Sequence, residues 1–224
     1  MTLFKLTLLT SFVFTLTTVN GQTKKQTHFG FSVGLGINNY IIKKSDWLQP
    51  QINYNDSLNS INSKSSVGIY LGLSYYLNLT EKVSLRPGLI LGLPSTGKLE
   101  FERKTETEIL DLSSITEEVS IQVNYKFTTK GFKPYLSIGP SFSFLIGQGD
   151  DTKSQIEFNT FDLLGQIGIG GEIPFKQFKI KPELQYSAGL LEMRKSKSNI
   201  YNNTISKLQR QNFTLTFYLC SLYD

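Results

Sequence analysis

The chain is poor in the residues on which metal sites and many catalytic sites depend. Its 224 residues include one cysteine, Cys220, and one histidine, His28. A single cysteine cannot form a disulfide within the chain, and no cluster of cysteine and histidine exists to bind zinc. We expect His28 to be a free residue at the start of the first strand, so it supports no Ser-His-Asp or Cys-His arrangement. The sequence therefore predicts no catalytic, cofactor or metal-binding residues and no enzymatic activity.

Charged residues are also scarce, at 18% of the chain. Lysine and arginine total 23 against 18 acidic residues, which gives a net charge of +5. Such a mild excess is compatible with anionic lipid, nucleic acid or solubility alone. Basic residues do not alternate with aromatic residues along one face, so we expect no nucleic-acid partner.

Long apolar runs are missing after the first 21 residues, so no transmembrane helix is predicted there. Residues 1–21 have the pattern of a secretory signal peptide: Lys5 supplies the positive charge, residues 6–19 form the apolar region, and cleavage is expected after Gly21. The alternative, a membrane anchor, would need an apolar run of about 20 residues. We therefore expect export, with residues 22–224 forming a single mature domain.

The mature part shows a sustained alternation of large apolar residues with small or polar ones. In the stretch FGFSVGLGI every odd position is large and apolar, and every even position is Gly or Ser. A period of two is typical of a β-strand, whose successive side chains point to opposite faces. The pattern predicts eight strands, at residues 29–37, 67–77, 83–93, 119–127, 136–146, 161–173, 178–190 and 213–219.

The segments between these strands alternate between short and long. Three are short turns, and four are long polar segments: residues 79–82, 128–133 and 174–177, against 38–65, 94–117, 147–159 and 192–211. In an antiparallel sheet, all the long segments then leave from the same end. Bacterial outer-membrane barrels show this asymmetry, with short periplasmic turns and longer external loops.

Alternation alone does not distinguish a membrane barrel from a soluble, lipocalin-like barrel with an apolar core. A soluble exterior would carry Lys and Glu, whereas the second face here carries Gly, Ser, Asn and Thr, with room among them for Tyr70, Tyr76 and Tyr218. Small residues suit the narrow interior of an eight-stranded barrel, which side chains fill. The small face is therefore expected to point inward and the apolar face toward lipid.

Strand length and aromatic residues support the same orientation. About 9–11 residues per tilted strand cross a bilayer. Residues for an interfacial aromatic girdle occur at the short-turn ends, namely Phe29, Tyr75, Tyr125, Phe127 and Phe178. We predict an all-β, eight-stranded antiparallel up-and-down transmembrane β-barrel in the outer membrane of a Gram-negative bacterium.

Several strands carry a proline close to a short turn, and in two of them it belongs to a Pro-Gly or Pro-Glu pair. The stretches are SLRPGL from Ser84, KPYLSIGPSFSFL from Lys133, and GIGGEIPF followed by IKPELQYSAGL. With these stretches the mature chain resembles, over essentially its whole length, the PorT-like outer-membrane β-barrel family of Bacteroidota. The resemblance implies a barrel without a defined activity, in a family linked through its founding member to gliding and protein secretion.

Six charged residues fall on the predicted inward face, all in the half nearest the short turns: Arg86, Lys126, Glu172, Lys179, Lys181 and Glu183. Unpaired charge is costly in a narrow lumen, so a compensated network that plugs the barrel is expected. Glu172 and Lys179 flank one turn and are predicted to be cross-strand neighbours, as are Tyr76 and Arg86. A proton or ion path is the alternative.

The last long segment carries five basic residues, with no acidic residue between the first and the last of them: Arg194, Lys195, Lys197, Lys207 and Arg210. On an outer-membrane protein this segment would meet lipopolysaccharide phosphates, which Arg and Lys bind through charge-assisted hydrogen bonds. A solvated loop without a ligand is the alternative.

Together these features predict a structural or binding component of the cell envelope with a filled lumen. Its expected partners are outer-membrane lipid, lipopolysaccharide and envelope proteins, and the resemblance adds an accessory role in a secretion or envelope assembly. A small-solute porin is the first alternative, although open aqueous channels belong to barrels of about 16–18 strands. A soluble periplasmic lipocalin-like binder is the second.

Overall fold

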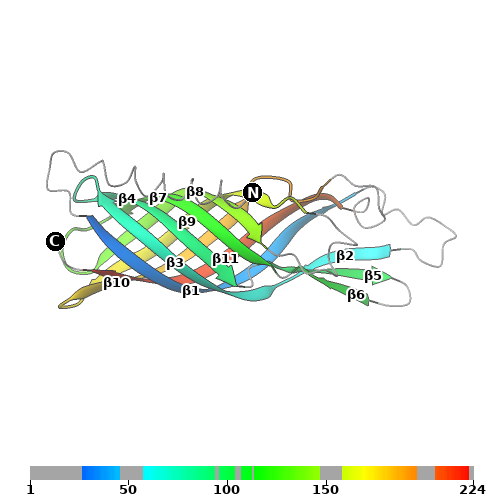
Figure 1. Cartoon of the computed structure of the whole chain (residues 1–224), viewed down its shortest axis with the longest axis horizontal. Coiled ribbons are helices and arrows are strands. Elements are labelled where there is room, and N and C mark those ends of the chain that lie inside the picture. Colours follow the sequence, from blue (N-terminus) through cyan, green and yellow to red (C-terminus); the bar gives the residue numbers. More distant parts are fainter. Residues whose placement is uncertain are drawn as a thin grey trace.

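The computed structural model describes residues 27–45, 58–93, 96–103, 107–112, 114–146, 158–195 and 205–221. Eight strands close into a barrel (Figure 1): β1 (Thr27–Lys44), β3 (Ser66–Asn78), β4 (Val83–Leu93), β7 (Ile115–Lys126), β8 (Lys133–Ile146), β9 (Phe161–Pro174), β10 (Phe178–Gly189) and β11 (Ile205–Ser221). Neighbours run antiparallel in the order β1-β11-β10-β9-β8-β7-β4-β3, and β3 pairs with β1 to close the sheet. The predicted all-β, eight-stranded antiparallel barrel is confirmed.

The predicted signal peptide, residues 1–21, lies outside the described part of the chain. Within the described part, no helix has the length and hydropathy that a membrane-crossing helix requires.

The large apolar residues of the alternation lie on the outside of the barrel. Leu35 on β1 lies opposite Leu215 on β11 and Ile69 on β3, and the three residues are 59%, 46% and 47% exposed. Ser32, on the other face of β1, is buried in the lumen. A continuous apolar exterior is suited to hydrocarbon rather than to water. This orientation excludes the soluble lipocalin-like alternative, in which the same residues would form the core.

Two close approaches explain why the inward face needs glycine. A Cβ atom on Gly36 would lie 2.6 Å from the ring of Tyr70 and 2.6 Å from the methyl group of Thr214. A Cβ atom on Gly170 would lie 2.6 Å from the ring of Tyr135. The glycines therefore leave the volume that the tyrosines occupy, as the sequence predicts. The three tyrosines expected in the lumen are all buried: Tyr70, Tyr76 and Tyr218.

The short turns lie together at one end of the barrel, on the left in Figure 1. Outward aromatic residues cluster at this end, and their rings pack in pairs: Phe29 with Tyr75 at 4.8 Å, Tyr125 with Phe127 at 5.6 Å, and Phe175 with Phe178 at 5.0 Å between centroids. The predicted girdle residues therefore lie where a membrane interface would meet the barrel.

The other end of the barrel carries a second, smaller sheet that the sequence did not predict. β2 (Leu58–Lys64), β5 (Lys98–Arg103) and β6 (Thr107–Asp111) pair in the order β2-β5-β6, at the right-hand end of Figure 1. β1 and β11 extend toward this sheet and stay paired as far as Lys44 and Ile205. We call the small sheet, together with these strand ends, the cap.

The cap has a hydrophobic core of its own, formed by Tyr40, Ile61, Leu99, Phe101, Leu110, Leu112, Phe158, Met193, Ile205 and Leu208. These residues come from all four segments predicted as polar loops, so that prediction is wrong for the parts that form the cap. The three cap strands are only 7, 6 and 5 residues long. Each therefore contributes too few apolar positions to show a clear period by itself.

Candidate functional site

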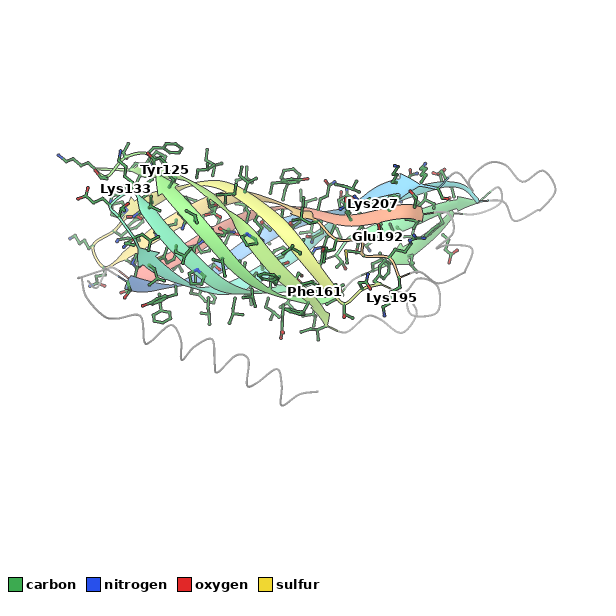
Figure 2. The ribbon with its side chains drawn as sticks, turned by 90° about the horizontal axis from the view of Figure 1, so that it is seen from above. Tyr125, Lys133, Phe161, Glu192, Lys195 and Lys207 are labelled. Carbon is green, nitrogen blue, oxygen red and sulfur yellow. The ribbon has the colours of Figure 1, made fainter. Side chains whose placement is uncertain are left out.

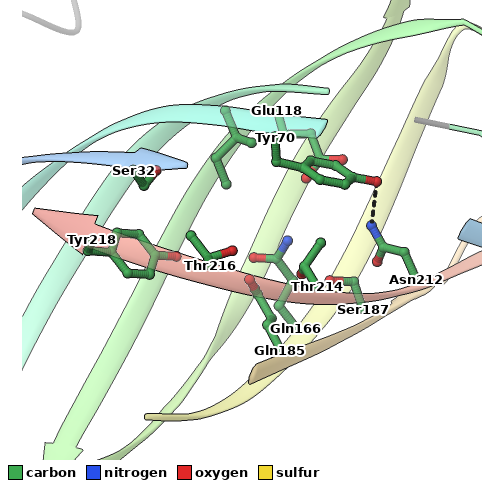
Figure 3. Close-up of a pocket in the computed structure, with 11 residues that line it drawn as sticks. Ser32, Tyr70, Glu118, Gln166, Gln185, Ser187, Asn212, Thr214, Thr216 and Tyr218 are labelled. Atoms are coloured by element: carbon green, nitrogen blue, oxygen red, sulfur yellow. Dashed lines mark hydrogen bonds between the residues drawn. The ribbon is translucent and has the colours of Figure 1, made fainter. Parts of the chain in front are cut away.

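Inward side chains leave little free space in the lumen. A cavity of about 20 Å³ lies among side chains that include Tyr70, Gln166, Asn212 and Tyr218 (Figure 3). Figure 3 shows Tyr70 and Asn212 turned toward each other, and Asn212 Nδ2 donates a hydrogen bond to Tyr70 Oη at 3.4 Å. The Tyr70 hydroxyl in turn donates to Asn38 Oδ1. A space of this size holds about one or two water molecules.

An ion pair between Arg86 and Glu183 spans the lumen on the short-turn side. Arg86 Nη1 and Nη2 donate to the two carboxylate oxygens of Glu183, each at 2.7 Å. The side chains are 3% and 0% exposed. Arg86 also donates to Gln122 Oε1, and Gln122 Nε2 donates to Gln166 Oε1 at 2.7 Å. The guanidinium carbon lies 4.3 Å from the centre of the Tyr218 ring, a cation–π contact.

Three lysines share the carboxylate of Glu172 at the short-turn end. The Nζ atoms of Lys126, Lys133 and Lys181 lie 3.6, 3.3 and 3.5 Å from its oxygens. Lys181 Nζ also lies 3.7 Å from the centre of the Tyr76 ring. Lys133 was not among the predicted lumen residues, because its position was assigned to a turn, whereas the structure places it at the start of β8.

The prediction that Lys179 is the cross-strand neighbour of Glu172 is wrong, because the neighbour is Lys181, two residues further along β10. Lys179 lies opposite Pro174 on β9 and Cys220 on β11, and it is Lys181 that reaches Glu172. The other predicted pair is supported, because the guanidinium carbon of Arg86 lies 5.9 Å from the ring centre of Tyr76 on the next strand.

A second charged cluster, on the cap side of the lumen, was not predicted. Arg210 Nη2 donates to Glu118 Oε1 at 2.7 Å and to Ser143 Oγ at 2.9 Å, and the two charged side chains are 1% and 3% exposed. Asp162 is also buried on this side. The predicted strands began at Val119 and Phe213, one residue after Glu118 and three after Arg210. The alternation of Thr116, Glu118 and Ser120 was the available signal.

The structure describes four of the five basic residues predicted to face lipopolysaccharide, and it does not place them together. Arg210 is inside the barrel and paired with Glu118, so its assignment to an external loop is wrong. Lys195 and Lys207 are exposed at the cap end, where Figure 2 labels both, and Arg194 is half-buried. Lys197 lies outside the described residues. An acid also approaches this segment, because Glu192 Oε1 accepts hydrogen bonds from the backbone N–H groups of Arg194 at 3.1 Å and Leu208 at 3.0 Å.

His28 is not the free residue that the sequence suggested. Its ring stacks on Tyr76, with centroids 4.9 Å apart and planes 8° from parallel, and the residue is buried. It lies at the short-turn end, opposite Tyr76 on β3. Among the described residues, no group of three or more His, Cys, Asp or Glu is placed to hold a metal ion.

A closed barrel with an apolar exterior, short turns at one end and ionic contacts in its lumen is a transmembrane β-barrel. The chain belongs to the family described as outer membrane protein beta-barrel domain, whose model matches residues 18–194. Membership of this family makes it an outer-membrane protein of a Gram-negative bacterium. A search of curated proteins found no match.

Several solved outer-membrane proteins have a similar fold. Neisserial surface protein A is 10% identical with a TM-score of 0.46, and the match covers 87% of this chain and 99% of that one. OprG from Pseudomonas aeruginosa is 11% identical, with a TM-score of 0.41 and coverage of 89% and 97%. The outer membrane enzyme PagL is 13% identical, with a TM-score of 0.41 and coverage of 84% and 97%. At these identities the likeness concerns the fold alone.

Proposed function

We propose that this protein is a closed, non-catalytic barrel that serves the outer membrane as a structural and binding component rather than as a solute channel. The observation that carries the proposal is that two buried ion pairs each join opposite walls of the lumen. Arg86 and Glu183 do so on the short-turn side, and Arg210 and Glu118 do so on the cap side.

Opening a path for solutes would require breaking both pairs. Separating a buried pair leaves two charges without partners, at a cost on the order of 3–5 kcal/mol per pair. The cavity between the clusters, at about 20 Å³, is too small for a solute larger than water. A closed barrel is therefore the stable state that these contacts favour.

Conductance in planar bilayers tests the closed lumen against the porin alternative. We expect no steady conductance from the wild-type protein. A variant that removes both pairs is expected to conduct small ions: Arg86→Ala, Glu118→Ala, Glu183→Ala and Arg210→Ala. Lys82→Gln with Lys130→Gln is the control, since it changes only charges in exposed turns. Steady single-channel conductance from wild type would make the porin the better description.

A non-catalytic role is supported by the position of the single histidine. His28 is buried against Tyr76 at the short-turn end, away from the cap. A hydrolase built on a His-dependent nucleophile would need that ring beside a Ser or Cys hydroxyl or thiol and an orienting acid. Purified protein is accordingly expected to release no fatty acid from lipopolysaccharide or phospholipid, and release that His28→Ala abolishes would contradict this.

Binding is assigned to the cap end, where the exposed Lys195 and Lys207 stand near Arg194. These two lysines offer a basic surface on the side of the membrane that carries lipopolysaccharide, whose phosphates are suitable ligands. Charge reversal by Lys195→Glu and Lys207→Glu is expected to reduce the lipopolysaccharide that co-purifies. The control reverses Lys82 and Lys130 at the opposite end, and equal loss in both variants would argue against a site on the cap.

Membership of the PorT-like group, and with it an accessory role in a secretion or envelope assembly, is the finer part of the proposal. Its support is the set of Pro-containing strands, now placed in β4, β8, β9 and β10. The test is the profile of exported proteins in a deletion strain, complemented with wild type or with a cap-truncated chain. An unchanged profile in the deletion strain would remove the secretion role and leave the closed barrel intact.

A further inference from the structure

Basic side chains outnumber acidic ones at the short-turn mouth of the barrel. Lys126, Lys133, Lys179 and Lys181 all lie there, and three of them share Glu172. Glu183 cannot neutralise the remaining positive charge of these lysines, because Arg86 donates to both of its carboxylate oxygens. Over the described residues of this mouth, the four lysines and one available carboxylate leave an excess of three positive charges. Uncompensated charge at a partly desolvated site is costly, so an additional anion would stabilise it.

The opposite end of the lumen does not share this excess. There Arg210 is paired with Glu118, and a second buried carboxyl side chain, that of Asp162, lies on the strand position opposite Ser143, to which Arg210 donates. The surplus of positive charge is thus specific to the short-turn mouth, the end that faces the periplasm in bacterial outer-membrane barrels.

A small cavity lies among these groups. It measures about 10 Å³ and is lined by Tyr76, Ser84, Asn124, Lys126, Tyr135, Glu172 and Lys181. Among the described residues, none pairs with the hydroxyl of Tyr135 through a hydrogen bond, although Tyr135 is only 3% exposed. Buried donors without acceptors are rare in folded proteins. A hydroxyl and two ammonium groups around one space are the donors that an oxyanion accepts from.

We propose that this mouth binds a phosphate group. One phosphate oxygen enters the cavity, where Lys126, Lys181 and Tyr135 donate to it. The remaining oxygens stay toward the surface, within reach of the half-buried Lys133 and Lys179. The cavity volume fits this division, because about 10 Å³ admits a single water-sized atom and not a whole phosphate. The site does not depend on whether the lumen conducts.

Two sources could supply the phosphate, an inner-leaflet lipid headgroup or a free anion of the periplasm. The mouth lies beside the aromatic girdle, since Lys126 and Lys133 flank a turn that contains the exposed Phe127 and Phe132. Aromatic residues of this kind lie at headgroup depth. The chemistry of recognition is the same for both sources, so experiment must distinguish them.

Phosphate binding is tested with the full chain in octyl glucoside, a detergent without phosphate. Inorganic phosphate is titrated against chloride at constant ionic strength, and the thermal unfolding midpoint is followed. Phosphate is expected to raise the midpoint, and Lys126→Gln with Lys179→Gln is expected to weaken binding about ten-fold. The control, Lys82→Gln with Lys130→Gln, removes the same charge from exposed turns at the same end and should change the affinity by less than about two-fold.

The variant Glu172→Gln is expected to change the affinity for phosphate in the opposite direction to the double lysine variant. The carboxylate competes with phosphate for the same amines, so its removal is expected to tighten phosphate binding about ten-fold. Unchanged or weaker binding would mean that the lysines serve the carboxylate alone, and the proposal would fail. This variant also keeps the test decisive if the double lysine variant does not fold.

Lipid retention identifies the source. Protein reconstituted in phosphatidylcholine with phosphatidylglycerol is extracted and analysed by native mass spectrometry. Retained phosphatidylglycerol that the double lysine variant loses assigns the site to a headgroup. A phosphate-dependent midpoint without retained lipid assigns it to a free anion. No response of the wild-type protein to either probe would overturn the proposal, whatever its conductance.

Discussion

Arg86 on β4 and Glu183 on β10 face each other across the lumen and share two hydrogen bonds of 2.7 Å. Their strands stand four places apart in a closed sheet of eight, so the pair joins opposite walls. Arg210 on β11 and Glu118 on β7 have the same relation on the cap side. Each pair therefore connects parts of the barrel that no hairpin brings together.

Removing one partner of the first pair is expected to be costly. Glu183→Gln keeps the shape of the side chain but leaves the Arg86 guanidinium buried without its counter-charge. We expect a loss on the order of 3 kcal/mol in the free energy of unfolding, measured by urea denaturation in detergent. The double variant Arg86→Met with Glu183→Leu should recover most of it, because no charge is then stranded. An unfolding midpoint for Glu183→Gln equal to that of Glu81→Gln would contradict the prediction.

The cap-side pair is expected to couple energetically within its own cluster. A double-mutant cycle of Arg210→Gln and Glu118→Gln should give a coupling free energy of about 1–3 kcal/mol. The matched cycle of Arg210→Gln with Glu183→Gln should be additive within about 0.5 kcal/mol, since these residues belong to different ion pairs. Coupling of equal size in both cycles would show that the two clusters act as one network.

The stability effects of removing the Glu172 and Glu183 carboxylates should differ in their dependence on salt concentration. Two of the three lysines that contact Glu172 are partly exposed, Lys126 at 13% and Lys133 at 26% of the side chain, whereas Lys181 is 4% exposed. Solvent-accessible charges are screened by salt, whereas buried pairs are screened much less. In phosphate-free buffer, Glu172→Gln is expected to lower the unfolding midpoint at low salt and progressively less at high salt, while the effect of Glu183→Gln stays constant. No change of midpoint at low salt would remove Glu172 from the lumen network.

The close contact of Gly36 with Tyr70 predicts a packing defect. Gly36→Ala places a methyl group 2.6 Å from the ring and from the methyl group of Thr214, and overpacking of this kind costs about 1–3 kcal/mol. Gly165→Ala is the control, because the nearest atoms to its new methyl group are those of Leu190, at 3.8 Å. Urea unfolding of both variants provides the comparison. Equal stability of the two variants would show that the lumen tolerates bulk at Gly36.

Loss of packing in the cap core is expected to destabilise the cap without unfolding the barrel. Phe101 is fully buried in the cap core, and Phe101→Ala would leave a cavity that costs about 3–5 kcal/mol. We expect limited proteolysis to cleave the variant within residues 94–117 while the barrel retains its heat-modifiable migration on gels. The control is Ile109→Ala, which truncates a 51% exposed side chain on the same small sheet. Loss of heat-modifiable migration in Phe101→Ala would instead show that the barrel depends on the cap.

The alternation of apolar and small residues along each segment was sufficient to predict the barrel strands and which of their faces points outward. Leu35, Leu215 and Ile69 lie outward and Ser32 inward because side chains of a strand alternate between faces whatever the rest of the chain does. Of the six predicted lumen residues, five make ion pairs inside the barrel: Arg86, Lys126, Glu172, Lys181 and Glu183. Lys179 lies on the same face, but the register of β9 and β10 places it beside Pro174 rather than beside Glu172.

The sequence alone determined the number of barrel strands and their outward apolar face, since both follow from a period of two along each segment, and the lengths of the connecting segments determined the end at which the turns are short. Tertiary structure decided which charges meet, because Arg86 and Glu183 are 97 residues apart and Arg210 and Glu118 are 92 apart. Those contacts exist only once the sheet has closed and set the stagger of opposite strands. The cap core likewise needs four segments at once, and none of them carries enough apolar residues to reveal it alone.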